Sequence, residues 1–251
     1  MKQLLFFAFF LFSSILLLSC SKEDTQNLEE EPIQKPTYKG IVMKNQIIET
    51  THLGKDEGKY TIYLPSDYQT SNKKYPVLYL LHGMWSHNNE WVEKGAAATL
   101  TDLAINKGTI GPMIIVMPNA FDSFYVDGYD KVHNYESFFW NDLIPYIESN
   151  YPVKTGKENT AIAGLSMGGF GASYYAFTHP DKFCLCYAMS GAVEGMGTDL
   201  VPSVKMMFEK LGYNETNYDK LPQYYLDCGT EDMMVYQTNV NNVSSTKYNC
   251  L

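Results

Sequence analysis

A serine lies between two glycines in the segment Gly164-Leu165-Ser166-Met167-Gly168. An apolar run precedes this segment and a helical pattern follows it, so we expect Ser166 on a sharp turn between a strand and a helix. Such a turn exposes the serine hydroxyl, which can then attack an acyl carbon as a nucleophile. The flanking glycines are also compatible with a tight turn that only packs, and this alternative stays open.

A nucleophile of this kind needs two N–H donors for the negative oxygen that develops on the acyl group. The backbone N–H of Met167, at the start of the expected helix, is one candidate. The second donor usually comes from the loop after an earlier strand, which indicates the backbone N–H of Met84. His82 lies at the end of that strand, and we favour a structural role for it over a role as the base.

A carboxylate is needed to orient the base. Asp232 follows the nucleophile in the chain and lies just past an expected strand, on a loop after Gly229. Asp227, inside that strand, and Glu231 are the second and third candidates. A solvated loop carboxylate without a catalytic role is the alternative for Asp232.

Histidine is the usual base in such sites, and the chain contains five: His52, His82, His87, His133 and His179. None of them follows Asp232. His133 and His87 belong to segments near expected strand ends, so both are considered as substitutes. Loss of the base of a serine triad can lower turnover by a factor on the order of 10⁶.

Strand-like and helix-like patterns alternate from residue 40 onward. Segments 40–53 and 59–64 alternate like antiparallel strands, and longer apolar runs are typical of strands buried on both faces. The expected buried strands are 75–83, 112–119, 159–166, 182–191 and 223–228, the last followed by a loop to 232, and the expected helices are 91–108, 134–151, 167–180 and 203–212. A kink or a new turn is expected at Pro145. This order predicts an α/β fold, with a mainly parallel sheet and helices on both faces.

The charge of the chain narrows the class of ligand. The net charge is −9, and none of the 19 basic residues is an arginine. A nucleic-acid-binding protein would need a basic face, so this class is excluded. No spacing of cysteine or histidine predicts a metal site, and serine chemistry requires neither metal nor cofactor. Cys184, Cys186 and Cys228 are expected to be buried free thiols.

The N-terminal residues are typical of an export signal. The 15-residue apolar run 4–18 is shorter than the roughly 20 residues of a membrane span. It ends at Leu17-Leu18-Ser19-Cys20, which resembles a bacterial lipoprotein signal with lipid on Cys20; an ordinary secretory signal is the alternative. We therefore expect a signal peptide at 1–20, a disordered acidic linker at 21–39 and a folded domain at 40–251. An exported lipoprotein of this kind would be held by its lipid at the outer membrane or the cell surface.

Five segments in this order resemble one esterase family: LYLLHGMWSHNNEW, GPMIIVMPNAF, DLIPYIESNYPV, AIAGLSMGGFGAS and CGTEDMMVY. That family includes feruloyl and acetylxylan esterases, esterase D and the mycolyltransferases, and the resemblance covers about residues 40–236. It implies an α/β-hydrolase fold and a carboxylic-ester hydrolase that removes acetyl or feruloyl groups from polysaccharides. It also implies Ser166 as the nucleophile, Asp232 as the acid, and the amides of Met84 and Met167 as the oxyanion hole. An acyltransferase of the mycolyltransferase type is an alternative.

The family pattern further implies a histidine well beyond the acid, in a Gly-Gly-His type loop. Because 19 residues follow Asp232, we expect a truncated chain that lacks the last strand and its helix. Strand 223–228 would then be an exposed edge, and the chain would be a catalytically impaired remnant unless another histidine substitutes. Six aromatic residues on expected active-face loops are candidates for stacking on a sugar or a phenolic acid, or for rim packing: Trp85, Trp91, Phe121, Phe124, Tyr125 and Tyr129.

Overall fold

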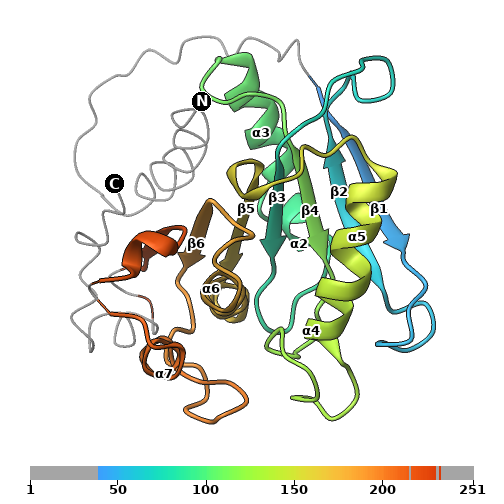
Figure 1. Ribbon diagram of the computed structural model, residues 1–251. Helices are drawn as coiled ribbons and strands as arrows, with labels where there is room; N and C mark the ends of the chain where they lie inside the picture. Colours follow the sequence, from blue (N-terminus) through green and yellow to red (C-terminus); the bar gives the residue numbers. More distant parts are fainter. Residues whose placement is uncertain (1–38, 215, 230–231, 233–251) are drawn as a thin grey trace, which may run out of the picture.

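The structure is a computed structural model that describes residues 39–214, 216–229 and 232 (Figure 1). Its centre is a seven-stranded sheet in the order β1-β2-β4-β3-β5-β6-β7. The strands are β1 (Ile41–Ile47), β2 (Lys59–Leu64), β3 (Val77–Leu81), β4 (Ile114–Pro118), β5 (Thr160–Leu165), β6 (Leu185–Met189) and β7 (Gln223–Asp227). β2 is antiparallel to both of its neighbours, and every pair from β4 to β7 is parallel. This confirms the predicted mainly parallel sheet.

Helices cover both faces of the sheet (Figure 1). One face carries α4 (Tyr135–Phe138), a π-helical turn (Phe139–Leu143), α5 (Ile144–Asn150), α6 (Met167–Thr178) and α7 (Val204–Leu211). The other face carries α2 (Glu90–Glu93) and α3 (Ala97–Asn106). Two short 3₁₀ turns, Lys157–Asn159 and Tyr218–Lys220, precede β5 and β7.

The two layers of helices explain why the parallel strands are apolar without alternation. In β3, Tyr79 and Leu81 belong to the core under α4 to α7, whereas Leu80 belongs to the core under α2 and α3. Successive side chains of a strand point to opposite faces, so a strand covered on both sides must be apolar at every position.

The expected helix 91–108 is wrong as a single helix. α2 ends at Glu93, α3 begins at Ala97, and Ala96 between them has a φ of 50°. The indole Nε1 of Trp91 donates to the carbonyl of Leu81 at 3.1 Å. A Cβ on Gly95 would lie only 2.8 Å from a ring carbon of the same indole. The buried tryptophan therefore requires a glycine next to it, and the chain turns there before α3 begins.

The new turn expected at Pro145 is confirmed. The π-helical turn separates α4 from α5, and Pro145 lies in the first turn of α5. Proline has no N–H to donate to the carbonyl four residues back, which is a common reason for a break in helical bonding.

β7 is the final strand of the sheet within the described residues, and all five of its residues are half-buried. Three expected features lie outside the described residues: the signal peptide with Cys20, most of the linker, and the segment after Asp232. In the ranges that the structure describes, no helix has the length and apolar character to span a bilayer.

Candidate active site

Ser166 lies on the expected turn between β5 and α6. Its φ is 55° and its ψ is −115°, a conformation that costs free energy for a residue with a side chain. The N–H of Ser166 donates to Met189 at 2.9 Å, and its carbonyl accepts from Phe170 and Ala192 at 3.1 and 3.0 Å. β6 and the loop after it therefore hold the strained turn in place. The Ser166 side chain is half-buried beside the exposed Leu165.

The turn depends on glycines because backbones meet there without room for a side chain. A Cβ on Gly164 would lie 2.1 Å from the carbonyl oxygen of Gly168. A Cβ on Gly168 would lie 2.5 Å from the carbonyl oxygen of Leu81 and 2.6 Å from that of His82. The first turn of α6 is therefore pressed against the end of β3.

The segments that carry the two expected oxyanion donors meet at Ser166. Met167 is the first residue of α6, where a backbone N–H has no carbonyl within the helix to bond. Gly83 precedes Met84, and a Cβ on Gly83 would lie 3.5 Å from the Cβ of Ser166. The structure thus brings the loop after β3 alongside the serine. The roles of Met84 and Met167 as donors stay predictions.

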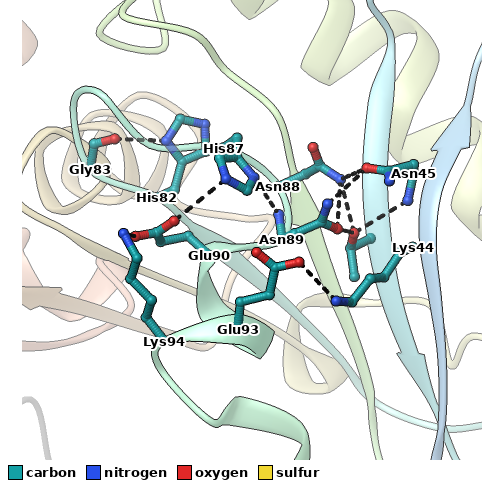
Figure 2. Close-up of polar contacts among 11 residues, drawn as sticks. Lys44, Asn45, His82, Gly83, His87, Asn88, Asn89, Glu90, Glu93 and Lys94 are labelled. Atoms are coloured by element: carbon teal, nitrogen blue, oxygen red, sulfur yellow. Dashed lines mark hydrogen bonds and ion pairs between the residues drawn. The ribbon is translucent and has the colours of Figure 1, made fainter.

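His82 is buried at the end of β3, and both of its ring nitrogens are hydrogen-bonded. Nε2 accepts from the N–H of Ala120 at 2.8 Å, so Nδ1 carries the proton and donates to the carbonyl of Gly83 at 2.7 Å (Figure 2). In a trans peptide the carbonyl and the N–H point in opposite directions. The bond to Gly83 therefore directs the N–H of Met84 away from the imidazole, and His82 has the structural role that we favoured.

Asparagine side chains anchor the far end of the same loop. Asn88 donates through Nδ2 to Thr61 at 2.9 Å and to Asn45 at 3.0 Å, and Asn89 donates to Asn45 at 2.9 Å (Figure 2). Because Asn45 and Thr61 belong to β1 and β2, the loop is fastened to the antiparallel edge of the sheet.

The two histidines considered as substitute bases have other partners. His133 lies between two carboxylates, with Nδ1 2.5 Å from Asp130 and Nε2 3.1 Å from Glu57, and its ring stacks on Phe121 at 4.1 Å. Both of its nitrogens are therefore engaged by carboxylates.

His87, the other candidate, is exposed at the surface of the loop. Its Nδ1 accepts from the N–H of Asn89 at 3.2 Å, and its Nε2 lies 3.6 Å from the carboxylate of Glu90 (Figure 2). Neither nitrogen of His87 is directed by these contacts toward Ser166.

The last two histidines belong to other parts of the molecule. His52 bonds through Nδ1 to Asp142 at 2.7 Å. His179 follows the 12 residues of α6 and its ring lies 4.0 Å from that of Trp140. Since a helix rises about 1.5 Å per residue, His179 is roughly 18 Å from the start of α6.

The candidate acids Asp227 and Asp232 lie at the end of β7 and after it, on the same edge of the parallel sheet as Ser166. Asp232 is half-buried, and its N–H donates to the carbonyl of Gly229 at 3.1 Å. Asp227 accepts a hydrogen bond from the hydroxyl of Tyr187, and burial raises the pKa of its carboxyl. Glu231 lies outside the described residues. The role of Asp232 stays a prediction.

Sequence reasoning missed the contribution of the loop after β4. Ala120 binds His82, and the carboxylate of Asp122 accepts from the N–H of Trp85 at 2.7 Å. These contacts join residues 38 and 37 positions apart, and no local pattern marks them. In the described part of the chain, no group of three or more His, Cys, Asp or Glu side chains could hold a metal ion.

Replacement of Gly168 by alanine is expected to lower the free energy of unfolding by about 1–3 kcal/mol, because the new methyl group would overlap two backbone oxygens. Urea unfolding monitored by circular dichroism measures this change. Gly229→Ala is the control, since a Cβ there meets its nearest neighbour at 3.8 Å. Equal stability of the two variants would contradict the contact between α6 and β3.

The buried imidazole of His82 is expected to make stability depend on pH. Burial lowers its pKa below the ordinary 6.5, so protons favour the unfolded chain. The contribution of His82 is present above about pH 6.5 and is lost as the pH falls toward the folded-state pKa. Urea unfolding between about pH 7.5 and about pH 5.5 should therefore show a smaller fall in stability for His82→Gln than for the wild type.

His87→Gln, which removes an exposed histidine next to the same loop, is the control for the His82 experiment. Asp122, Glu90 and His87 also influence the pKa of His82. All three residues stay in place in His82→Gln, so that variant removes the buried imidazole alone. The same pH dependence in wild type and His82→Gln would refute the assignment of a buried, neutral His82.

Comparisons with known proteins agree with this architecture. The family model named Esterase matches residues 51–246. A solved ferulic acid esterase is 32% identical, with a TM-score of 0.68 over 79% of this chain and 82% of that chain. A CE1 ferulic acid esterase from Anaeromyces mucronatus, solved in complex with ferulic acid, is 26% identical, with a TM-score of 0.54 over 84% of this chain and 79% of that chain.

Among curated relatives, an esterase of Mycobacterium tuberculosis is 35% identical over 148 residues, which is 57% of this chain and 31% of the relative. The endo-1,4-beta-xylanase/feruloyl esterase of Xylanibacter ruminicola is 31% identical over 164 residues, 61% of this chain and 23% of the relative. The chain thus spans less than a third of the length of either relative. With the family model covering most of its length, the chain belongs to the Esterase family and has the α/β-hydrolase fold.

Proposed function

We propose that this protein is a carboxylic-ester hydrolase that removes acyl groups, acetyl or feruloyl, from polysaccharides. The observation that carries this proposal is the strained turn at Ser166, with a φ of 55° and the loop of Gly83 beside it. A fold that only needed a turn would relax this strain, whereas a nucleophile gains an exposed hydroxyl from it. The relatives named as feruloyl esterases support the choice of substrate class.

The proposed reaction proceeds through an acyl-enzyme. The hydroxyl oxygen of Ser166 bonds to the acyl carbon, and its proton passes to a base. The amides of Met84 and Met167 hold the negative oxygen until the bond to the sugar oxygen breaks and the sugar leaves with a proton. Water then attacks the acyl-serine, releases the acid and restores the hydroxyl. Asp232 would orient the base.

A second candidate, an impaired esterase, is favoured by the partners of the histidines. All five lie within the described residues, and each is held by other groups, so we assign the base to none of them. We therefore propose that turnover by the chain is slow and that an external base can raise it.

Hydrolysis of p-nitrophenyl acetate, measured with and without free imidazole, tests both candidates. Without imidazole we expect a low rate. With imidazole, and after subtraction of hydrolysis by imidazole alone, we expect the wild type to be at least about tenfold faster than Ser166→Ala, since the other parts of a triad site retain activity. A rate that depends on Ser166 without imidazole would identify an internal base, which would support the esterase and discard the impaired candidate.

Equal rates for wild type and Ser166→Ala under both conditions would refute an esterase built on this serine. A labelled fluorophosphonate, which bonds to activated serines, provides a second readout: it should mark the wild type but not Ser166→Ala where the chain has an internal base, and neither protein where it has none.

Transfer of the acyl group to a sugar is a further candidate, because a diacylglycerol acyltransferase/mycolyltransferase of Mycobacterium leprae is 29% identical over 158 residues, 53% of this chain and 42% of the relative. Addition of an oligosaccharide to the assay would then yield acylated sugar. Free acid as the sole acyl product would discard this candidate.

We also propose that the protein is exported as a lipoprotein, at the outer membrane or the cell surface. The support is the apolar run that ends at Leu17-Leu18-Ser19-Cys20. Labelled palmitate should be incorporated into the wild type and not into Cys20→Ser. Cys250→Ser, at the other end of the chain, is the matched control and should be labelled, whereas labelling of Cys20→Ser would contradict the proposal.

A further inference from the structure

The side chain of Trp85 is exposed to an unusual degree. It is 87% exposed, more than any other large apolar side chain of the described residues. Tryptophan carries a large apolar surface, and proteins ordinarily cover most of it. In contrast, Trp91, six positions on in the same segment, is buried and bonds Leu81.

The backbone of Trp85 is strained as well. Its φ is 61°, in the left-handed region that favours glycine. Its N–H donates to the carboxylate of Asp122 at 2.7 Å, which holds the residue in this conformation. A bulky residue here costs the fold free energy that glycine would not cost.

Three other aromatic residues also have a positive φ, but their side chains make packing contacts that offset the backbone strain. Phe121, Phe124 and Tyr125 also have positive φ angles, of 53°, 52° and 61°. Phe124 and Tyr125 are buried in the core, and Phe121 stacks on His133. Trp85 has the strain without the burial, so stability of the fold does not explain why a tryptophan is there.

Trp85 lies near the proposed nucleophile. A Cβ on Gly83 would be 3.5 Å from the Cβ of Ser166. Trp85 is two residues further, a reach of at most about 7 Å along the backbone. A molecule bound at Ser166 could therefore extend over the indole within the length of one or two sugar rings.

The composition of the chain and the contact of Trp85 with Asp122 indicate an uncharged ligand. The chain has no arginine and a net charge of −9, and the carboxylate of Asp122 binds the backbone of Trp85, so these features do not favour an anion. A pyranose ring has an apolar face of C–H groups and a rim of hydroxyls. Such a ring can lie on an open indole while its rim stays hydrated, whereas a wholly apolar group would need an enclosed pocket.

We propose that Trp85 is a binding platform for a sugar ring of the polysaccharide next to the ester that Ser166 attacks. This inference rests on the proposed function and adds the residue that holds the carbohydrate. The strained conformation presents the indole outward, and Asp122 keeps it there.

Binding of xylohexaose, measured by isothermal titration calorimetry in the Ser166→Ala background, tests the platform without relying on catalysis. We expect millimolar or tighter binding, at least about tenfold weaker after the additional change Trp85→Gly and largely restored by Trp85→Phe, since stacking on an aromatic is worth about 1–3 kcal/mol in the comparable case of nucleic-acid bases. Val132→Ala, which truncates another exposed apolar side chain, is the matched control and should bind as before.

The same variants separate a binding defect from a folding defect. Trp85→Gly should unfold in urea at the same or a higher concentration than the parent, because glycine relieves the left-handed strain. Undiminished xylohexaose binding by Trp85→Gly, or no binding by the Ser166→Ala parent at millimolar sugar, would overturn the proposal. If Trp85→Gly weakened the binding of methyl ferulate but not that of xylohexaose, the indole would be assigned to an aromatic acyl group, which would also overturn the proposal.

These results are distinguishable from failure of the proposed function. A chain that binds xylohexaose through Trp85 but shows no Ser166-dependent hydrolysis would keep the platform and discard the esterase. A chain with Ser166-dependent hydrolysis and no effect of Trp85 on sugar binding would keep the esterase and discard the platform.

Discussion

The close contact between the first turn of α6 and the backbone around it is the constraint on which the rest of the structure depends. At Gly164, Gly168 and Gly169, one methyl group would come within 2.1, 2.5 and 2.7 Å of backbone atoms. Packed backbone cannot move aside as the end of a flexible side chain can, so these positions exclude any larger residue. The contact sets the distance between Ser166 and the loop after β3, and so decides which amides a molecule at the serine would meet.

The position of the loop after β3 also depends on one neutral imidazole, that of His82. His82 accepts from Ala120 and donates to Gly83, and in this way joins the loops that follow β3 and β4. A protonated ring would have to donate at both nitrogens, which would leave the N–H of Ala120 facing another donor. The hydrogen-bond pattern and the lowered pKa therefore have a common origin in burial. His82, Asn88 and Asn89 thus fasten the loop through buried side chains with specific partners.

Strain in this region is distributed unevenly, and that distribution separates structure from function. Tyr125 combines a positive φ with full burial, a bond from its hydroxyl to the carbonyl of His82 at 2.8 Å, and an edge contact with Tyr135 at 5.3 Å. The fold thus recovers what the backbone loses. Trp85 has comparable strain and almost no burial, which is the combination expected where a side chain serves a ligand rather than the core.

By itself, the sequence determined the buried strands and the turn at Ser166, because strands covered on both faces must be apolar at every position and a glycine-flanked serine between strand and helix has few other conformations. It failed at 91–108, where the helical pattern continues across a break that only the packing of Trp91 on Gly95 requires. It also left the histidines open, since one partner of His82 and one of His133 come from segments 38 and 76 positions away. Tertiary structure alone decided those partners, the strand order and the exposure of Trp85, because each depends on which distant segments the fold brings together.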